Sequence, residues 1–389
     1  MVGAMELTLL MPCLNEADTV AVCVRKARET LGRLGIEGEV LVADNGSTDG
    51  SIELAEEAGA RILHVAERGY GSALMAGITA ARGEFVLMAD ADDSYDFTAI
   101  EPFVSKLRAG AELVQGCRLP SGGGRVLSGA MPALHRWIGN PLFTRLARWW
   151  FGTPVHDTNC GMRAFRRDLI PRLDQRCTGM EFANEMLIKA TLIGTRIEEV
   201  PVTLHPDGRK SRRPHLRTFR DGWRTLRFYL LFSPRWLFLV PGALLMLLGF
   251  LGWGVAAGGV DLAGRTLGGN AMIVSGMLLL CGYQSVLFAL LTKAFAINEG
   301  LLPMDGRMKR FFQRVTLERG LVVGGIVLVT GLALVGTALC RWWSRETATD
   351  ATAEATALAV VGGTLGTLGF QTVLFSFFAS LLGMAMRRR

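Results

Sequence analysis

The chain has 389 residues, 50% of them hydrophobic, with 42 Lys or Arg against 35 Asp or Glu. The apolar excess is concentrated after about residue 236, so the two parts of the chain are suited to two different solvents. The net charge of +7 does not indicate a nucleic-acid-binding protein, because basic and acidic side chains nearly balance over the first 236 residues. Seven scattered cysteines without a CxxC pair indicate neither a disulfide framework nor a zinc site.

Short apolar runs rich in β-formers alternate with segments of helical period in the first part of the chain. The runs predict strands at Leu7–Met11, Glu39–Ala43, Arg61–Val65, Phe85–Ala89 and Leu113–Gly116, and the periodic segments predict helices at Thr19–Leu34, Ile52–Ala58 and Ser72–Ala81. Alternation of strand and helix predicts a mostly parallel, Rossmann-like α/β sheet. Ligands of such sheets bind beyond the carboxyl ends of the strands, so the loops there are the candidate site.

Three polar loops follow the first, second and fourth predicted strands, and we expect them to share one rim of the sheet. They are Pro12-Cys13-Leu14-Asn15-Glu16, Asp44-Asn45-Gly46-Ser47-Thr48-Asp49-Gly50 and Asp90-Ala91-Asp92-Asp93. Asp90 and Asp92 are two residues apart at a strand end, so their carboxylates point to one side and can share a divalent cation that holds a diphosphate. Asp44 offers a carboxylate to the N–H groups of a uracil or guanine base. Turn formation or capping is the alternative role for Asp90 and Asp92, and capping of the next helix is the alternative for Ser47 and Asp49.

Four uncharged stretches follow residue 235. They lie between Arg235 and Asp261, Arg265 and Lys293, Arg319 and Arg341, and Glu354 and Arg387. Each is long enough to cross about 30 Å of hydrocarbon as a helix, which predicts four transmembrane helices; a buried soluble helical domain is the alternative. Basic residues in the 298–320 loop and at the C-terminus place both termini in the cytoplasm, and no signal sequence is expected at the N-terminus. The sequence therefore predicts a multi-pass protein of the cytoplasmic (inner) membrane.

The segment before the first apolar stretch is strongly basic. From Thr203 to Trp236 there are nine Lys or Arg against two Asp, a density that anionic lipid head groups would attract. Leu216, Phe219, Trp223, Leu226 and Leu230 recur at spacings of three and four, which predicts an interfacial helix. For the tryptophan-rich stretch from Leu134 to Trp150, the membrane interface and packing on the soluble core remain alternatives.

Six motifs together resemble the family 2 glycosyltransferases that make polyprenyl-phosphate sugars: PCLNE, ADNGSTDG, ERGYGSALMAG, MADADDS, DTNCGMRAF and EVPVTLHPDGRKSRRPH. The resemblance covers about residues 6–236. It implies an inverting hexosyltransferase with an α/β GT-A catalytic domain, a UDP- or GDP-sugar donor and Mg²⁺ or Mn²⁺. Relatives similar to dolichyl-phosphate mannose or glucose synthases also carry C-terminal membrane helices. The expected division is a GT-A domain at 1–203, a basic juxtamembrane segment at 204–236 and a four-helix transmembrane domain at 237–389.

The resemblance also implies roles for individual residues. Pro12, Asn15, Glu16 and Asp44 would contact the nucleoside, while Asp90 and Asp92 would hold the metal and donor. The family's next metal-side residue, often Gln, is Ser94 here, so Ser94, Asp93 and water remain open as the third ligand. Arg118 follows the fifth predicted strand, and Arg136 begins an element that ends at Asn140, where the family has Ser. Both arginines would bind the acceptor phosphate, because a planar guanidinium can donate two hydrogen bonds to it. The alternative for Arg136 is a solvated interfacial charge. Arg209, Ser211 and Arg212 match a juxtamembrane phosphate-binding element.

The identity of the acceptor decides whether the enzyme needs a general base. A hydroxyl acceptor requires one, and Asp157 or Glu185 could serve. A lipid phosphate is largely dianionic at neutral pH and needs none, so these carboxylates would then orient sugar hydroxyls or arginines. The predicted partners are a nucleotide-sugar, a polyprenyl phosphate and the membrane, without nucleic acid, and a homo-oligomer is left open.

Three other functions are alternatives to this one. The nearest is transfer to a lipid hydroxyl, as in glycolipid or ceramide synthases. A processive polysaccharide synthase is less favoured, because the Gln-x-x-Arg-Trp element is missing before Trp236. A non-enzymatic membrane protein that senses nucleotide-sugar would need an impaired rim, whereas Asp44, Asp90, Asp92 and Arg118 are all present.

Overall fold

The computed structural model describes residues 5–209, 218–258, 261–262, 265–266, 269–344 and 349–386. The chain forms two compact units, Met1–Tyr229 and Leu230–Arg389. The boundary falls inside one helix, and the expected division at residues 203 and 236 stays a prediction. Ser211 and Arg212 lie outside the described residues.

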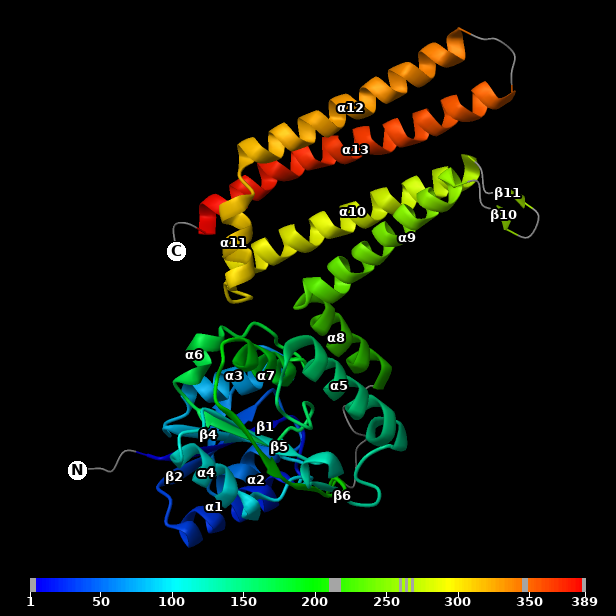
Figure 1. The fold of residues 1–389 in the computed structure, drawn as a ribbon. Helices are drawn as coiled ribbons and strands as arrows, with labels where there is room; N and C mark the ends of the chain where they lie inside the picture. Colours follow the sequence, from blue (N-terminus) through cyan, green and yellow to red (C-terminus); the bar gives the residue numbers. More distant parts are fainter. Residues whose placement is uncertain are drawn as a thin grey trace. The chain divides into compact units, whose positions relative to one another are not determined.

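A seven-stranded sheet forms the centre of the first unit (Figure 1). Its strands are β1 (Leu7–Cys13), β2 (Gly38–Asp44), β3 (Arg61–His64), β4 (Phe85–Met88), β5 (Leu113–Cys117), β7 (Arg163–Arg166) and β8 (Ile197–Pro201), in the order β3-β2-β1-β4-β7-β5-β8. Strand β7 runs antiparallel to both neighbours, and all other adjacent strands are parallel. The mostly parallel sheet is confirmed, and the five expected strands lie within two residues of their predicted bounds. Strands β6 (Arg125–Val126) and β9 (Thr203–Leu204) form a separate parallel pair.

Helices cover both faces of this sheet because successive side chains of a strand point to opposite sides. Leu7, Leu9 and Met11 of β1 belong to one apolar cluster, whereas Leu10 belongs to the other. The first cluster includes α1 (Val20–Leu34), α2 (Ser51–Glu57) and α4 (Glu101–Arg108), and the second includes α3 (Tyr70–Ala80), α6 (Leu169–Leu173) and α7 (Phe182–Leu192). The resulting three layers fix the strand ends, and thus the loops that follow them, at one rim.

Two further helices of the first unit expose aromatic side chains. They are α5 (Asn140–Phe151), which follows a π-helical turn at His135–Gly139, and α8 (Thr218–Leu231). The buried Tyr229 ring of α8 contacts Phe143 and Phe151 of α5 edge-on. Trp137, Trp149, Phe219 and Trp223 are exposed, so these four do not pack into the core of their unit. The predicted helix at 216–230 is confirmed over its described part.

The second unit contains five helices in its described residues. They are α9 (Val240–Ala257), which a π-helical turn at Arg235–Leu239 precedes, α10 (Gly269–Asn298), α11 (Gly306–Arg314), α12 (Leu317–Trp343) and α13 (Thr349–Met386), with the short strands β10 (Asp261–Leu262) and β11 (Arg265–Thr266) between α9 and α10. Four segments are long and apolar enough to cross a membrane: Arg235–Ala257, Gly269–Asn298, Leu317–Trp343 and Glu354–Met384. The four predicted membrane helices are thus confirmed by length and composition.

Helices α12 and α13 lie against each other along their length (Figure 1). Glycines permit this contact, because a Cβ atom added at Gly331 or Gly369 would clash with backbone atoms of the partner helix. Small residues that let backbones approach are typical of helix pairs in membranes.

Candidate active site

The three polar loops share one rim, as predicted, and hydrogen bonds join them. The backbone N–H of Asn15 donates to Ser47 Oγ at 2.8 Å, and the N–H of Thr48 donates to Asn15 Oδ1 at 2.8 Å. Across the sheet, the Thr19 hydroxyl donates to the carbonyl of Ala91 at 2.7 Å, next to Asp92. Asn15 has a φ of 59°, a left-handed conformation that Asn tolerates better than most residues. The loop after β1 is therefore tied to the loops on both sides.

Several residues expected at the nucleoside also shape these loops. The Asp44 carboxylate, only 2% exposed, accepts the backbone N–H groups of Gly46 and Ser47 at 3.0 to 3.2 Å. Asn15 uses its side-chain oxygen for the Thr48 contact, while Pro12 lies in β1 with its side chain half-buried. Asp44 thus stabilises the turn that follows β2, and Ser47 joins two loops rather than capping α2, whose N-cap residue is Gly50.

Asp90 and Asp92 follow β4 at the centre of the rim. The Tyr70 hydroxyl donates to Asp90 Oδ1 at 2.9 Å, and the backbone N–H of Ser94 donates to Asp92 Oδ1 at 3.1 Å. Burial, together with the charge of Asp92, raises the pKa of Asp90 to about 6. Asp90 Oδ2 faces Gly161, where an added Cβ would lie 2.9 Å away. Glycine at position 161 therefore lets its loop lie close to the Asp90 carboxylate.

Arg209 reaches this acidic pair from the segment after β9. The N–H of Gly208 donates to the carbonyl of Asp92 at 2.9 Å, which holds the segment against the loop. The Arg209 guanidinium donates through Nε and Nη2 to the two carboxylate oxygens of Glu16, and its Nη1 lies 3.4 Å from Asp92 Oδ2. Glu16 is 5% exposed, so the ion pair is shielded from water, and these carboxylates raise the pKa of Arg209 although burial alone would lower it. The side chain expected at the nucleoside, Glu16, is thus the partner of Arg209.

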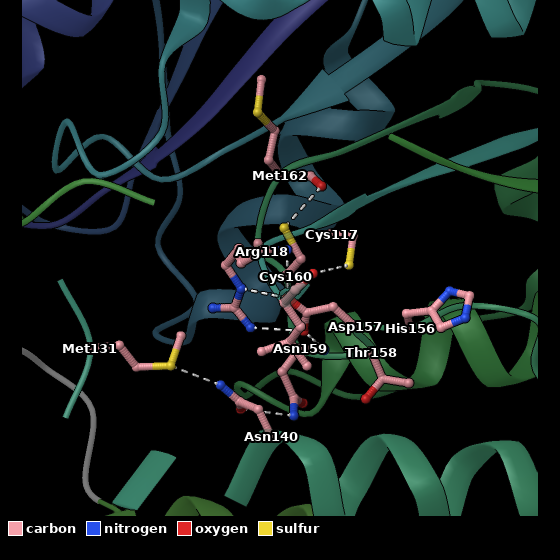
Figure 2. Close-up of polar contacts among 12 residues, drawn as sticks. Cys117, Arg118, Met131, Asn140, His156, Asp157, Thr158, Asn159, Cys160 and Met162 are labelled. Carbon is pink, nitrogen blue, oxygen red and sulfur yellow. Dashed lines mark hydrogen bonds and ion pairs between the residues drawn. The ribbon is translucent and has the colours of Figure 1, made fainter. Parts of the chain in front are cut away.

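Arg118 and Asp157 form a second buried ion pair beyond β5 (Figure 2). Arg118 donates from Nε to Asp157 Oδ2 at 2.7 Å and from Nη2 to Oδ1 at 2.9 Å, and its backbone N–H donates to Oδ2 at 3.0 Å. The N–H of Asn159 donates to Oδ1 at 3.1 Å. Asp157 is fully buried and accepts four hydrogen bonds. Its geometry is that of a residue that fixes an arginine.

Glu185 on α7 is also occupied within the fold. It is 1% exposed, accepts the backbone N–H groups of Arg176 and Cys177, and forms an ion pair with Lys189 at 2.8 Å. These contacts anchor the loop before α7, so the geometry explains Glu185 as a structural residue.

Arg136 stands apart from the two ion pairs. Its guanidinium carbon lies 5.2 Å from the ring centroid of Trp137, and no hydrogen bond within the described ranges joins it to Arg118 or Asp157. The structure therefore does not bring the two predicted acceptor arginines into contact.

Ser94 is 8% exposed, and its carbonyl accepts the N–H of His205 at 2.9 Å. Within the described residues, no group of three or more His, Cys, Asp or Glu has the geometry of a metal site. An ion at Asp90 and Asp92 would thus have two protein carboxylates.

Three residues that the sequence did not single out also shape the site. Tyr70 donates to Asp90, Gly161 lets its loop lie close to Asp90, and Asn159 links Asp157 to the N-terminus of α5. Tyr70 lies between two glycines at the start of α3, and Gly161 and Asn159 lie in the DTNCGMRAF motif. The motifs that contain these residues can be read from the sequence. Their contacts cannot, because the partner residues lie in other motifs.

Comparison with known proteins identifies the family. Residues 8–173 match the model of glycosyl transferase family 2, and residues 290–383 match the glycosyltransferase family 2 C-terminal transmembrane region. The low-salt glycan biosynthesis hexosyltransferase Agl6 of Haloferax volcanii is 37% identical over 98% of this chain and 90% of the relative. The dolichyl-phosphate hexose transferase of the same organism is 35% identical over 51% of this chain and 82% of the relative.

A solved structure shows a more remote likeness. Glucosyl-3-phosphoglycerate synthase from Mycobacterium tuberculosis, in complex with Mn²⁺, UDP and phosphoglyceric acid, is 22% identical and covers 58% of this chain and 78% of its own, with a TM-score of 0.46. That likeness is too distant to assign its ligands to this chain. The full-length match to a hexosyltransferase and the two family models agree with the sheet and the four apolar helices. The chain is a membrane protein that belongs to glycosyltransferase family 2.

Proposed function

We propose that this glycosyltransferase moves a hexose, with inversion, from a UDP- or GDP-sugar to a polyprenyl phosphate at the cytoplasmic face of a membrane. One observation carries the choice of acceptor: the two carboxylates considered as general bases are both fully engaged. Asp157 pairs with Arg118, and Glu185 anchors a loop. A hydroxyl acceptor would have to give its proton to such a base, whereas a lipid phosphate is already a nucleophile.

Asp90 and Asp92 are the proposed ligands of a divalent ion, Mg²⁺ or Mn²⁺. Mg²⁺ is usually bound through one or two carboxylates together with substrate phosphates, which fits the two carboxylates of Asp90 and Asp92. A bound ion would neutralise charge on the departing diphosphate. Ser94 holds Asp92 through its backbone N–H, so its role as a third ligand stays a prediction, as does that of Asp93.

The donor would lie along the same rim. Pro12, Asn15 and Asp44 are proposed to line the nucleoside subsite, with Asn15 and Asp44 also fixing its loops. We assign Glu16 the task of orienting Arg209, whose guanidinium next to Asp92 is placed to contact the donor diphosphate. Ser211 and Arg212, which are outside the described residues, remain predictions for the same phosphate-binding element.

Arg118 would orient the acceptor phosphate, because Asp157 fixes the guanidinium plane before the ligand arrives. Arg136 is proposed as a second, more mobile phosphate contact, since its guanidinium is held only against Trp137 among the described residues. One acceptor oxygen then bonds to the anomeric carbon as the bond to the nucleoside diphosphate breaks on the opposite side. This single displacement inverts the configuration of the anomeric carbon.

Chemistry at a lipid head group requires the first unit to lie at the membrane surface. The exposed Trp137, Trp149 and Trp223 and the basic residues of α8 suit the interface of an anionic membrane. The basic residues of α11, Arg307, Lys309, Arg310 and Arg314, favour a cytoplasmic location for the connection between α10 and α12.

The test is transfer by the purified full-length protein. It is incubated with Mg²⁺ or Mn²⁺ and labelled UDP- and GDP-sugars, with undecaprenyl phosphate in one set and diacylglycerol or ceramide in the other, and the labelled lipid is extracted. Asp92→Ala is the inactive control, and Asp168→Ala, which removes an exposed carboxylate, is its matched control. Label on the polyprenyl phosphate supports the proposal and names the donor. Label on the hydroxyl lipids alone would refute the proposal that the acceptor is a polyprenyl phosphate. The reaction would then require a carboxylate as general base.

A further inference from the structure

Four side chains form an uninterrupted hydrogen-bonded chain from α8 to the start of α5. The Tyr229 hydroxyl donates to Asn184 Oδ1 at 3.1 Å, and Asn184 Nδ2 donates to Asn159 Oδ1 at 3.2 Å. Asn159 Nδ2 then donates to Asn140 Oδ1 at 3.2 Å. The chain thus joins α8, α7, the loop before β7 and the N-terminus of α5, four segments that are distant in sequence.

The hydroxyl of Tyr229 sets the direction of the whole chain. Burial raises the pKa of Tyr229, so the phenol keeps its proton, and a hydrogen bond with Thr158 occupies the same oxygen. The carbonyl oxygen of Asn184 accepts from Tyr229 in this arrangement, which turns the Asn184 NH₂ group toward Asn159. The same logic turns the Asn159 NH₂ group toward Asn140. Each amide orientation therefore depends on the one before it.

The hydrogen-bonded chain ends at the Asn140 NH₂ group, whose acceptor is a weak one. Asn140 Nδ2 lies 3.2 Å from Met131 Sδ, which is its one hydrogen-bond acceptor among the described residues. A thioether sulfur is a weak acceptor, so a charged oxygen would be a far better one. Asn159, which holds Asn140, also donates its backbone N–H to Asp157, the partner of Arg118. Hydrogen bonds thus connect Asn140 to Arg118 through Asn159 and Asp157 (Figure 2).

We propose that Tyr229, Asn184 and Asn159 are positioning residues that present the Asn140 amide N–H to the phosphate of the acceptor lipid, beside Arg118. This inference rests on the proposed function and deepens it. Without the Tyr229 hydroxyl, Asn184 no longer has one preferred orientation, and a flipped amide would turn a carbonyl oxygen toward a phosphate that repels it. The three residues thereby act on acceptor affinity without touching the donor.

The test is a double-variant cycle on the full-length enzyme with undecaprenyl phosphate as acceptor. Tyr229→Phe keeps the ring contacts with Phe143 and Phe151 and removes only the hydroxyl. We expect it to raise the KM for the lipid phosphate about 10- to 150-fold, the effect of one lost hydrogen bond to a charged group, with the donor KM unchanged. Asn140→Ala should have an effect at least as large, and adding Tyr229→Phe to it should cause no further change, because the first residue acts through the second.

Tyr283→Phe is the matched control. It also removes a tyrosine hydroxyl, one that is 2.6 Å from Thr372 Oγ1 between α10 and α13, and it should leave both KM values unchanged. Equal changes in the donor and acceptor KM, or additive effects of Tyr229→Phe and Asn140→Ala, would overturn the proposal.

If the wild type transfers sugar only to a hydroxyl lipid, the proposed acceptor is wrong, and so is the proposed contact between Asn140 and a phosphate. The same double-variant cycle with that hydroxyl lipid then tests the link from Tyr229 to Asn140 separately. Non-additive effects confined to its KM would still support the Tyr229-to-Asn140 link, and additive effects would overturn the link as well.

Discussion

Replacing Asp157 with Asn should separate a residue that fixes an arginine from a catalytic base. The variant keeps the size of the side chain but removes its charge from a fully buried position opposite Arg118, which is 8% exposed. Asp157 accepts four N–H groups, two on each oxygen, so an NH₂ group in place of either oxygen faces two donors. A buried charge left without its partner costs about 3–5 kcal/mol. For a unit of this size, that corresponds to a fall in Tm on the order of 10 °C.

The free cysteines of the first unit provide the assay. Cys13, Cys23, Cys117 and Cys160 are buried there, so a fluorogenic thiol reagent reacts with them as this unit unfolds. Asp168→Ala, which removes an exposed carboxylate and keeps the Arg118 pair intact, is the control and should lower Tm much less. If Asp157→Asn changes Tm by less than about 2 °C while transfer falls by about a thousandfold, Asp157 acts as a base and the acceptor is a hydroxyl.

Three further predictions concern the rim. Asp92→Ala should abolish transfer, with a loss of at least about 100-fold, and leave the thiol-reagent Tm close to that of the wild type; retained transfer would refute the metal role. Glu16→Gln and Arg209→Gln should each raise the donor KM, and the double variant should be no worse than the worse single variant because the pair acts as one unit; additive effects in steady-state kinetics would contradict this. Asp90 has a pKa raised to about 6 in the fold, so its stabilising contribution is present at low pH and is lost as pH rises through about 6. With chelator present, Asp90→Asn should therefore raise Tm relative to the wild type at pH 7.5, and this advantage should shrink steadily as pH falls from about 6 toward the ordinary pKa of 3.8; a difference that does not change with pH would refute the raised pKa.

Hydrophobic pattern was sufficient for the part of the fold that is built from consecutive strand–helix units. The runs that became β1 to β5 are apolar and bounded by polar loops, and a shared rim follows from parallel strands. Strands β7 and β8 were not predicted. The sequence of β7 begins and ends with Arg163 and Arg166, and β8 carries Glu198 and Glu199, which suit an edge strand but hide its period.

The site was predictable where a motif lies at one strand end and unpredictable where it joins distant segments. Asp90 and Asp92 follow from local spacing alone. The pairing of Glu16 with Arg209 joins residues 193 positions apart, and that of Arg118 with Asp157 spans 39. Charge complementarity permits many such pairs in a sequence with 42 basic and 35 acidic side chains, and only the packed fold selects among them. The resemblance to a family named these residues but did not say which of them bind one another.

The glycine contacts between α12 and α13 affect how the whole protein denatures. Helices that meet backbone to backbone are held by dispersion and weak Cα–H···O contacts, which owe little to the release of water. The sheet of the first unit depends instead on burial of apolar side chains from water, the term that heat and denaturants act on. The protein should therefore unfold in two separate steps, with its membrane helices still paired after the sheet has melted, and a single free energy of unfolding does not describe it.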